Sequence, residues 1–142
     1  MNIKYSIVKK ADKQQIITLY KQAGWWTLEE DGNDSFVEDI IKNTHLFAIA
    51  KQGEQIIGMG RAISEGVSDA YIQDVTVLKE YRKKGIGGTI IKLLVNKLRS
   101  EKIGWIGLIS EPGADKFYTK LGFEQMKGYT PFLYKGKDSN CE

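Results

Sequence analysis

Residues 71–98 carry the feature that most constrains the fold of this chain: a strand-forming run, a basic turn, and a glycine-rich start to an apolar helix. Glycine lacks a Cβ, so the turn can bend sharply and expose its amides. The helix beyond it offers unpaired N–H groups and the positive end of its dipole, where phosphate oxygens bind readily. The glycines are Gly85, Gly87 and Gly88, and the basic residues before them are Arg82, Lys83 and Lys84. We therefore predict a phosphate-binding turn between a strand and a helix.

Charge is distributed unevenly along the chain. Residues 79–102 hold eight basic and two acidic residues, whereas residues 25–41 hold six carboxylates and no Lys or Arg. The net charge of +3 is too small to predict nucleic-acid binding by itself. A basic and an acidic region within 142 residues indicate two different ligands.

Length and composition predict one domain over residues 1–135, followed by a polar tail at 136–142. Cys141 is the only cysteine, so no internal disulfide can form, which is typical of a reducing compartment. No apolar stretch has the length of a membrane span, and the first residues lack the apolar run of a signal peptide. We expect a cytoplasmic protein with no membrane partner.

The spacing of apolar residues predicts an α/β fold, a mixed α+β sheet with helices packed on its faces. The expected strands cover residues 2–8, 46–51, 56–63, 71–77, 105–110 and 129–134. The expected helices cover residues 12–23, 34–41, 86–99 and 114–121, the first capped by Asp12 and stopped by Gly24. The element order is therefore β-α-α-β-β-β-α-β-α-β.

Other glycine-rich nucleotide-binding turns do not fit. A P-loop needs a Lys after its glycines, but here the lysines precede them. The dinucleotide fingerprint needs a third glycine where this chain has Ile90. A glycine turn that serves packing alone leaves the three adjacent basic residues without a purpose.

The run RKKGIG at residues 82–87 matches every fixed position of Q/R-x-x-G-x-G/A, the acetyl-CoA motif of the GNAT superfamily of N-acetyltransferases. Residues 114–123, ADKFYTKLGF, are close to that family's A-x-x-F-Y-x-K-L-G-F segment. The chain thus resembles this family at motif level over residues 71–123 and in element order over residues 2–135.

The resemblance implies acetyl-CoA as co-substrate and no metal. Main-chain amides of the turn would hold the pyrophosphate of coenzyme A, and the main chain at Val75 and Val77 would pair with the pantetheine arm like an added strand. That pairing needs strands 71–77 and 106–110 to be splayed apart, as they are in family members. The turn residues implied are Arg82, Lys83, Lys84, Gly85, Ile86, Gly87, Gly88 and Thr89.

Acetyl transfer to an amine requires a proton donor for the departing thiolate, and the resemblance assigns this role to Tyr118. The base is open. Many family members place a Glu where this chain has Tyr71, and Asp74 is the nearest carboxylate, although strand alternation turns it away from Val75 unless a bulge intervenes. Asp74 as base therefore competes with an ordering role, and a water chain is a further alternative. Two more carboxylates, Asp69 and Glu111, are expected within reach of the splayed region, and the single histidine, His45, is interpreted as structural.

The family's acceptor pocket is built by the first two helices and their connection, here GWWTLEEDGNDS. Aromatic faces attract cations and carboxylates steer them, so this segment favours a cationic amine. The alternative is that Trp25 anchors the loop while the acids form a solvated rim. The substrate-binding candidates are Trp25, Trp26, Glu29, Glu30 and Tyr71.

These observations predict an acetyl-CoA-dependent N-acetyltransferase acting on a primary amine, either a small cationic amine or a protein amino group. The alternative is a non-catalytic acyl-CoA-binding module of the same fold. Nucleic acid is disfavoured as a partner because Tyr81 is the only aromatic residue among the basic ones. A homodimer is expected from the resemblance alone.

Overall fold

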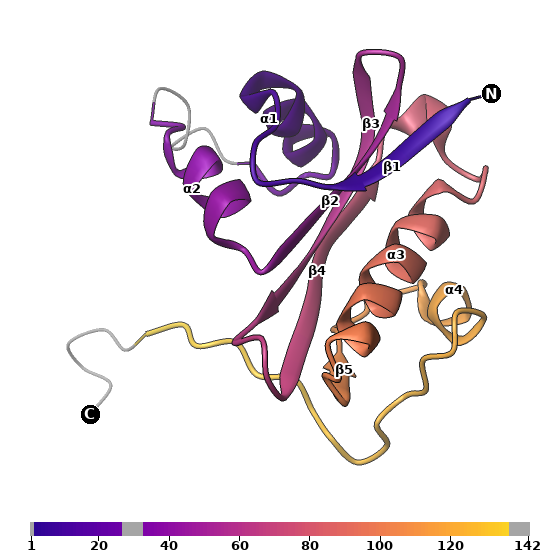
Figure 1. Cartoon of the computed structure of the whole chain (residues 1–142). Coiled ribbons are helices and arrows are strands. Elements are labelled where there is room, and N and C mark those ends of the chain that lie inside the picture. The colour runs from indigo at the N-terminus through magenta and orange to yellow at the C-terminus, as the bar shows by residue number, and fades with distance from the viewer. Residues whose placement is uncertain (1, 27–32, 137–142) are drawn as a thin grey trace. The chain divides into compact units, whose positions relative to one another are not determined.

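The computed structural model describes residues 2–26 and 33–136, in two compact units that span residues 1–108 and 109–142 (Figure 1). The strands are β1 (Ile3–Ile7), β2 (Leu46–Gln52), β3 (Gln55–Ser64), β4 (Asp69–Val77) and β5 (Trp105–Gly107). The helices are α1 (Lys13–Gln22), α2 (Phe36–Asn43), the short 3-10 helix η2 (Lys79–Tyr81), α3 (Ile86–Ser100) and α4 (Asp115–Thr119). Only α4 lies in the second unit.

The first unit is built on a five-stranded sheet in the order β1-β2-β3-β4-β5. Strands β1 to β4 are antiparallel neighbours, and β5 pairs parallel to β4 after the crossover through α3. Antiparallel neighbours need only tight turns, whereas a parallel pair needs a long connection, which here is the helix that begins at the glycine turn. The mixed sheet confirms the predicted fold class.

Helices cover both faces of this sheet. Gly58 and Gly60 of β3 face Ile90 on α3, whereas Arg61 reaches Asp74 and, through it, Tyr20 of α1. Successive strand residues point to opposite faces, so α1 and α3 lie on opposite sides of the sheet. The fully buried side chains come from α1, α2, β2, β3 and α3: Ile16, Leu19, Val37, Ile41, Phe47, Ile57, Met59, Ile90, Ile91, Leu94 and Leu98.

The ends of α1 lie within one residue of the predicted ones, because local capping residues define them. Asp12 caps α1 by accepting a hydrogen bond from the amide of Gln15 at 3.2 Å, and Gly24 follows the helix with a φ of 82°. Both features were expected, because Asp is a favoured N-cap and glycine tolerates a left-handed conformation.

Two strand predictions differ from the structure. The strand expected over residues 105–110 ends at Gly107, where its pairing with β4 stops. The strand expected over residues 129–134 is not formed in the described part of the chain, and Tyr129, Phe132 and Tyr134 are 75%, 92% and 87% exposed. A strand needs a neighbouring edge, and Pro131 removes a donor from the middle of this segment. The last strand of the predicted order is therefore absent from residues 33–136.

The single domain expected over residues 1–135 stays a prediction, and most of the expected tail, residues 137–142, lies outside the described residues. Within the described ranges, no helix has the length and hydropathy needed to cross a membrane.

Gly60 of β3 packs closely against Ile90 of α3. A Cβ at this position would lie 2.9 Å from Cγ2 of Ile90 and 3.1 Å from Cγ2 of Val75. We expect Gly60→Ala to lower the free energy of unfolding by about 1–3 kcal/mol, because overpacking forces buried side chains to shift. Urea denaturation measures this, with Gly104→Ala as the control, since a Cβ at Gly104 meets nothing within 4 Å. Equal midpoints for the two variants would contradict the close approach.

Candidate functional site

The turn before α3 has the conformation expected of an anion-binding loop. Gly85 is the N-cap of α3 with a φ of 84°, and Lys83 is also left-handed, with a φ of 63°. The first amide that bonds inside the helix is that of Thr89, which donates to the carbonyl of Gly85 at 3.1 Å. The amides of residues 86–88 precede this bond and are free of the helical ladder. Lys83, Lys84 and Gly85 are exposed, so the loop is open to a charged ligand.

The turn is fixed to the end of β4. Nε of Arg82 donates to the carbonyl of Val77 at 2.8 Å, which turns the guanidinium back toward the strand. Ile86 is 2% exposed, so its side chain packs into the core and is not available to a ligand. Gly88 is buried as well, whereas Thr89 is exposed and its hydroxyl donates to the carbonyl of Gly85. These features fit a phosphate group held mainly by main-chain amides.

The edge of β4 that faces β5 is paired over only part of its length. The register of the two strands joins Asp69 to Trp105 and ends with Tyr71 opposite Gly107. In the described part of the chain, residues 72–77 of β4 have no β5 partner, although they stay paired to β3 on the other side at most positions. Beyond Tyr71, β4 therefore has an edge without a β5 partner, which the implied pairing with pantetheine needs. Val75 and Val77 lie on the unpaired stretch, which leads to the glycine turn.

β4 is interrupted by a bulge at Asp74. Its φ is 58°, and the register shifts so that Asp74 and Val75 together stand opposite Gly60 of β3. Oδ2 of Asp74 accepts hydrogen bonds from Nε of Arg61 at 2.7 Å and from the hydroxyl of Tyr20 at 2.8 Å. The bulge that the predicted base role requires is thus present, and one carboxylate oxygen of Asp74, Oδ2, is held by these two donors. The contacts favour an ordering role.

Tyr20 lies in the same network and is 8% exposed. Burial raises the pKa of the Tyr20 phenol, and the neighbouring Asp74 carboxylate raises it further. The phenol therefore keeps its proton at neutral pH and acts as a donor to Asp74.

The acceptor-side aromatic residues form a cluster around Tyr20. Its ring contacts Trp25 at 6.3 Å and Trp26 at 6.4 Å between centroids, and Trp26 stacks on Phe36 at 5.4 Å. Trp25 is 36% exposed, so it has both an anchored and an accessible side. The two carboxylates predicted beside this cluster, Glu29 and Glu30, lie outside the described residues.

Tyr71 stands at the end of the β4–β5 pairing rather than in this cluster. Its ring lies 5.0 Å from that of Trp105, and both side chains are partly exposed. A Cβ on Gly107 would meet the Trp105 ring at 2.5 Å, so this glycine is required for the indole to lie over β5. Tyr71 thus marks the last pair of the β4–β5 register.

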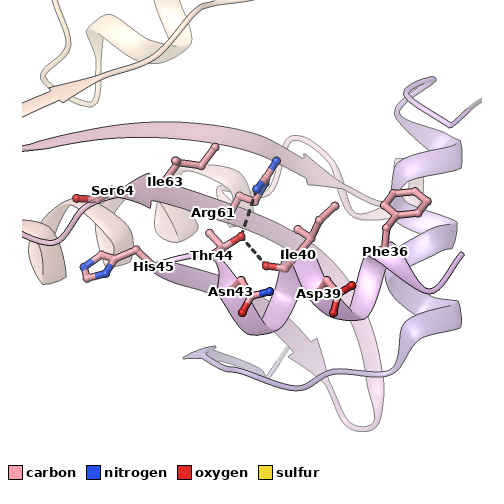
Figure 2. Close-up of a pocket in the computed structure, with 9 residues that line it drawn as sticks. All are labelled: Phe36, Asp39, Ile40, Asn43, Thr44, His45, Arg61, Ile63 and Ser64. Carbon is pink, nitrogen blue, oxygen red and sulfur yellow. Dashed lines mark hydrogen bonds between the residues drawn. The ribbon is translucent and has the colours of Figure 1, made fainter.

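A shallow cavity of about 410 Å³ opens between α2 and β3 (Figure 2). Arg61 lines it, and Nη1 of Arg61 donates to the hydroxyl of Thr44 at 3.2 Å. The hydroxyl of Thr44 in turn donates to the carbonyl of Ile40 at 2.5 Å. The other lining residues are Phe36, Asp39, Asn43, His45, Ile63 and Ser64.

Of the acceptor candidates that the structure describes, Trp25, Trp26 and Tyr71, none lines this cavity, although Trp26 stacks on Phe36, which does. Sequence reasoning missed Arg61. The available signal was a lone cation in the apolar strand IIGMGRAI, because a charge at such a position requires a partner.

His45, interpreted as structural, bonds through Nε2 to Oε1 of Glu101 at 2.7 Å. That contact joins the start of β2 to the end of α3, as a structural role requires. In the part of the chain that is described, no group of three or more His, Cys, Asp or Glu side chains could hold a metal ion.

Tyr118 lies on α4 in the second unit. Its ring packs edge-on against Phe117 at 5.0 Å and Phe123 at 6.1 Å. Burial raises the pKa of the Tyr118 phenol, and the Glu111 carboxylate raises it further. A phenol with a raised pKa stays protonated at neutral pH, as a proton donor must.

Comparison with known proteins identifies the family. Residues 16–132 match the family model described as "Acetyltransferase (GNAT) domain". The chain is 39% identical over 74 residues to GCN5-related N-acetyltransferase 2, chloroplastic, of Arabidopsis thaliana, covering 52% of this chain and 29% of that protein. It is 36% identical over 69 residues to the uncharacterized N-acetyltransferase ycf52 of Pyropia yezoensis, covering 49% and 40%. The chain therefore matches less than half the length of these curated relatives.

Solved structures share the fold. An acetyltransferase, GNAT family protein, from Streptococcus pneumoniae superposes with a TM-score of 0.81 at 22% identity, covering 96% of this chain and 100% of the other. The structure of AAC(6')-Iy in complex with the bisubstrate analog CoA-S-monomethyl-acetylneamine superposes with a TM-score of 0.77 at 17% identity, covering 96% of this chain and 99% of the other. The family model, which spans most of the chain, and this common fold lead to one conclusion: the chain belongs to the GNAT family of acetyltransferases.

Proposed function

We propose that this protein transfers an acetyl group from acetyl-CoA to a primary amine. One observation carries the proposal. Residues 72–77 of β4, which have no β5 partner in the described part of the chain, lead directly into the open turn that begins α3. Pantetheine can extend a sheet along such an edge, and pyrophosphate can bind the amides at the helix start. One strand thus leads from the acyl end of the ligand to its phosphate end.

The reaction is direct attack in a ternary complex. The neutral amine nitrogen attacks the thioester carbonyl carbon, the C–S bond breaks, and an N-acetyl product and the thiol of coenzyme A are released. The amine loses one proton and the departing sulfur takes one up. Tyr118 is the proposed donor to the sulfur, and a water chain or a carboxylate is the proposed route for the amine proton.

The proposed acceptor is a small cationic amine. Trp25, Trp26 and Phe36 form an aromatic cluster with the buried Tyr20, whose hydroxyl bonds to Asp74 at the bulge. Aromatic faces favour cations, and Glu29 and Glu30 add negative charge to the same connection in sequence. A protein amino group is the second acceptor class, and the cytoplasm stays the proposed location.

Ligand binding is tested by thermal unfolding with acetyl-CoA, coenzyme A and RNA in parallel. At 100 times the dissociation constant, acetyl-CoA is expected to stabilise the protein by about 2.7 kcal/mol, or about 8 °C. RNA is the control and is expected to give no shift. The absence of any shift with acetyl-CoA would rule out both the enzyme and a non-catalytic acyl-CoA-binding module.

Thiol release with a panel of amines then separates these two functions. An enzyme releases one thiol per acetylated amine, whereas a binding module releases none above the rate without amine. The panel should pair cationic amines with neutral amines of similar size, because preference for the cations tests the proposed acceptor class.

A further inference from the structure

Asp74 has an unusual backbone for a residue inside a strand. Its φ of 58° is left-handed, and it shares one position opposite Gly60 with Val75. Such a bulge leaves an extra residue out of the ladder and turns the main chain locally. A non-glycine residue holds this conformation only where its surroundings fix it, although Asp tolerates it better than most residues.

The side chains of Tyr20 and Arg61 hold the Asp74 carboxylate at this bulge. We name the three residues Tyr20, Arg61 and Asp74 the Asp74 clamp. Arg61 and Tyr20 both donate to the same oxygen of Asp74, at 2.7 and 2.8 Å. The side chains of Arg61 and Asp74 are only 17% and 21% exposed, so the ion pair is largely shielded from water. Charge-assisted hydrogen bonds of this kind are short and directional.

The clamp joins four elements around the bulge. Tyr20 comes from α1, Arg61 from β3 and Asp74 from β4. Arg61 extends it to the end of α2 through the hydroxyl of Thr44, as the dashed lines in Figure 2 show. The Tyr20 ring also contacts Trp25 and Trp26, so the clamp connects the bulge to the aromatic cluster on the acceptor side.

The bulge lies between the two ends of the proposed acetyl-CoA path. The β4–β5 pairing ends at Tyr71, three residues before Asp74, and the glycine turn begins after Val77. A thioester bound along residues 72–77 would lie against the main chain of this stretch, which includes Asp74 and Val75. The direction of those main-chain groups depends on the clamp, and small displacements of groups that align a reaction are costly in rate.

We propose that Asp74 is a positioning residue for acetyl transfer. Its carboxylate, held by Arg61 and Tyr20, fixes the left-handed bulge so that the main chain at Val75 meets the acetyl carbonyl. The inference rests on the proposed function and gives Asp74 an ordering role in place of the base role, because Oδ2 already accepts from Arg61 and Tyr20.

The test follows the Val75 amide by NMR while ¹⁵N-labelled protein is titrated with acetyl-CoA and, separately, with coenzyme A. In the wild-type protein, we expect the Val75 signal to shift with acetyl-CoA and to shift much less with coenzyme A. Asp74→Ala is expected to abolish this difference while amides of the glycine turn still respond to both ligands. Asp74→Asn is expected to keep it, because Asn tolerates the left-handed backbone and retains an acceptor oxygen.

Kinetics give a second readout. Asp74→Ala is expected to lower kcat about 100-fold with the KM for acetyl-CoA changed about twofold or less, and Asp74→Asn to lose about fivefold or less. Tyr20→Phe removes one donor and leaves the ion pair, so a loss of about threefold to tenfold is expected even if Asp74→Ala unfolds. The control is Lys102→Ala, which places Ala at another left-handed position, with a φ of 65°, after α3.

The NMR and kinetic results distinguish failure of the proposed function from failure of the positioning role. No response of any amide to either ligand overturns the proposed function itself. A response at the turn without an acetyl-dependent shift at Val75 overturns the positioning role and leaves the proposed function intact. Equal loss of kcat in Asp74→Asn and Asp74→Ala, together with loss of the acidic limb of the pH profile, restores Asp74 as the base. Wild-type kcat in Asp74→Ala shows that the clamp has no part in the reaction.

Discussion

Replacement of Tyr118 by Phe is expected to lower kcat for acetyl transfer about 100-fold, the usual range for loss of a general acid. The phenyl ring keeps its packing against Phe117 and Phe123, so the fold should persist. Only the hydroxyl is removed, and with it the proton for the departing thiolate. Initial rates of thiol release with saturating acetyl-CoA and amine measure the effect.

The Tyr118 assignment also predicts how kcat changes at alkaline pH. Burial and the Glu111 carboxylate raise the pKa of the Tyr118 phenol, so the protonated, active donor persists to higher pH than it would for a free tyrosine. In the wild-type protein, kcat should therefore fall only at a pH above that at which a free tyrosine loses its proton, and Tyr118→Phe should lack this alkaline limb.

Tyr129→Phe is the matched control, because this tyrosine is in the same unit and is 75% exposed. It should retain wild-type kcat. Full activity in Tyr118→Phe would show that another group protonates the thiolate.

Gly87→Asp is expected to weaken coenzyme A binding by at least about 100-fold, because a like charge placed against a bound anion costs several kcal/mol. Gly87 lies in the first turn of α3, directly after the left-handed Gly85. A carboxylate there would occupy the positive helix end that the pyrophosphate uses. The same charge favours the helix itself, so the melting temperature of the unliganded protein should stay level or rise.

Isothermal titration with coenzyme A measures the loss. Gly87→Ala is the control, since the family motif accepts Ala at this position and affinity should change little. Affinity in Gly87→Asp that matches Gly87→Ala would show that the phosphates bind elsewhere. A fall in melting temperature would mean that Gly87 is required for packing rather than for ligand approach.

Local chemistry made several features predictable. Asp12 and Gly24 bound α1 through interactions within a few residues of each other. The glycine turn is also local, because the missing Cβ atoms and the start of an apolar helix lie in one short run. The sequence did not predict the bulge at Asp74. It showed only that Asp74 could act as a base if a bulge were present, because alternation in a regular strand turns this side chain away from Val75.

Other features depend on contacts that distant residues make. Arg61 and Asp74 are 13 residues apart and Tyr20 and Asp74 are 54 apart, so no sequence window contains the clamp. The strand expected at residues 129–134 is a prediction that failed for the same reason. Its apolar pattern is suitable, but a strand forms only where an edge pairs with it, and pattern alone supplies no edge.

The sequence by itself determined the mixed sheet, the helix that follows the glycine turn and, through two short motifs, the GNAT family, because caps, glycines and apolar spacing act over a few residues. Tertiary structure alone decided that the β4–β5 pairing stops at Tyr71 and that Asp74 is held by Arg61 and Tyr20. Strand pairing and a shielded ion pair exist only when segments far apart in the chain meet, and the energy of each depends on the burial that the complete fold creates.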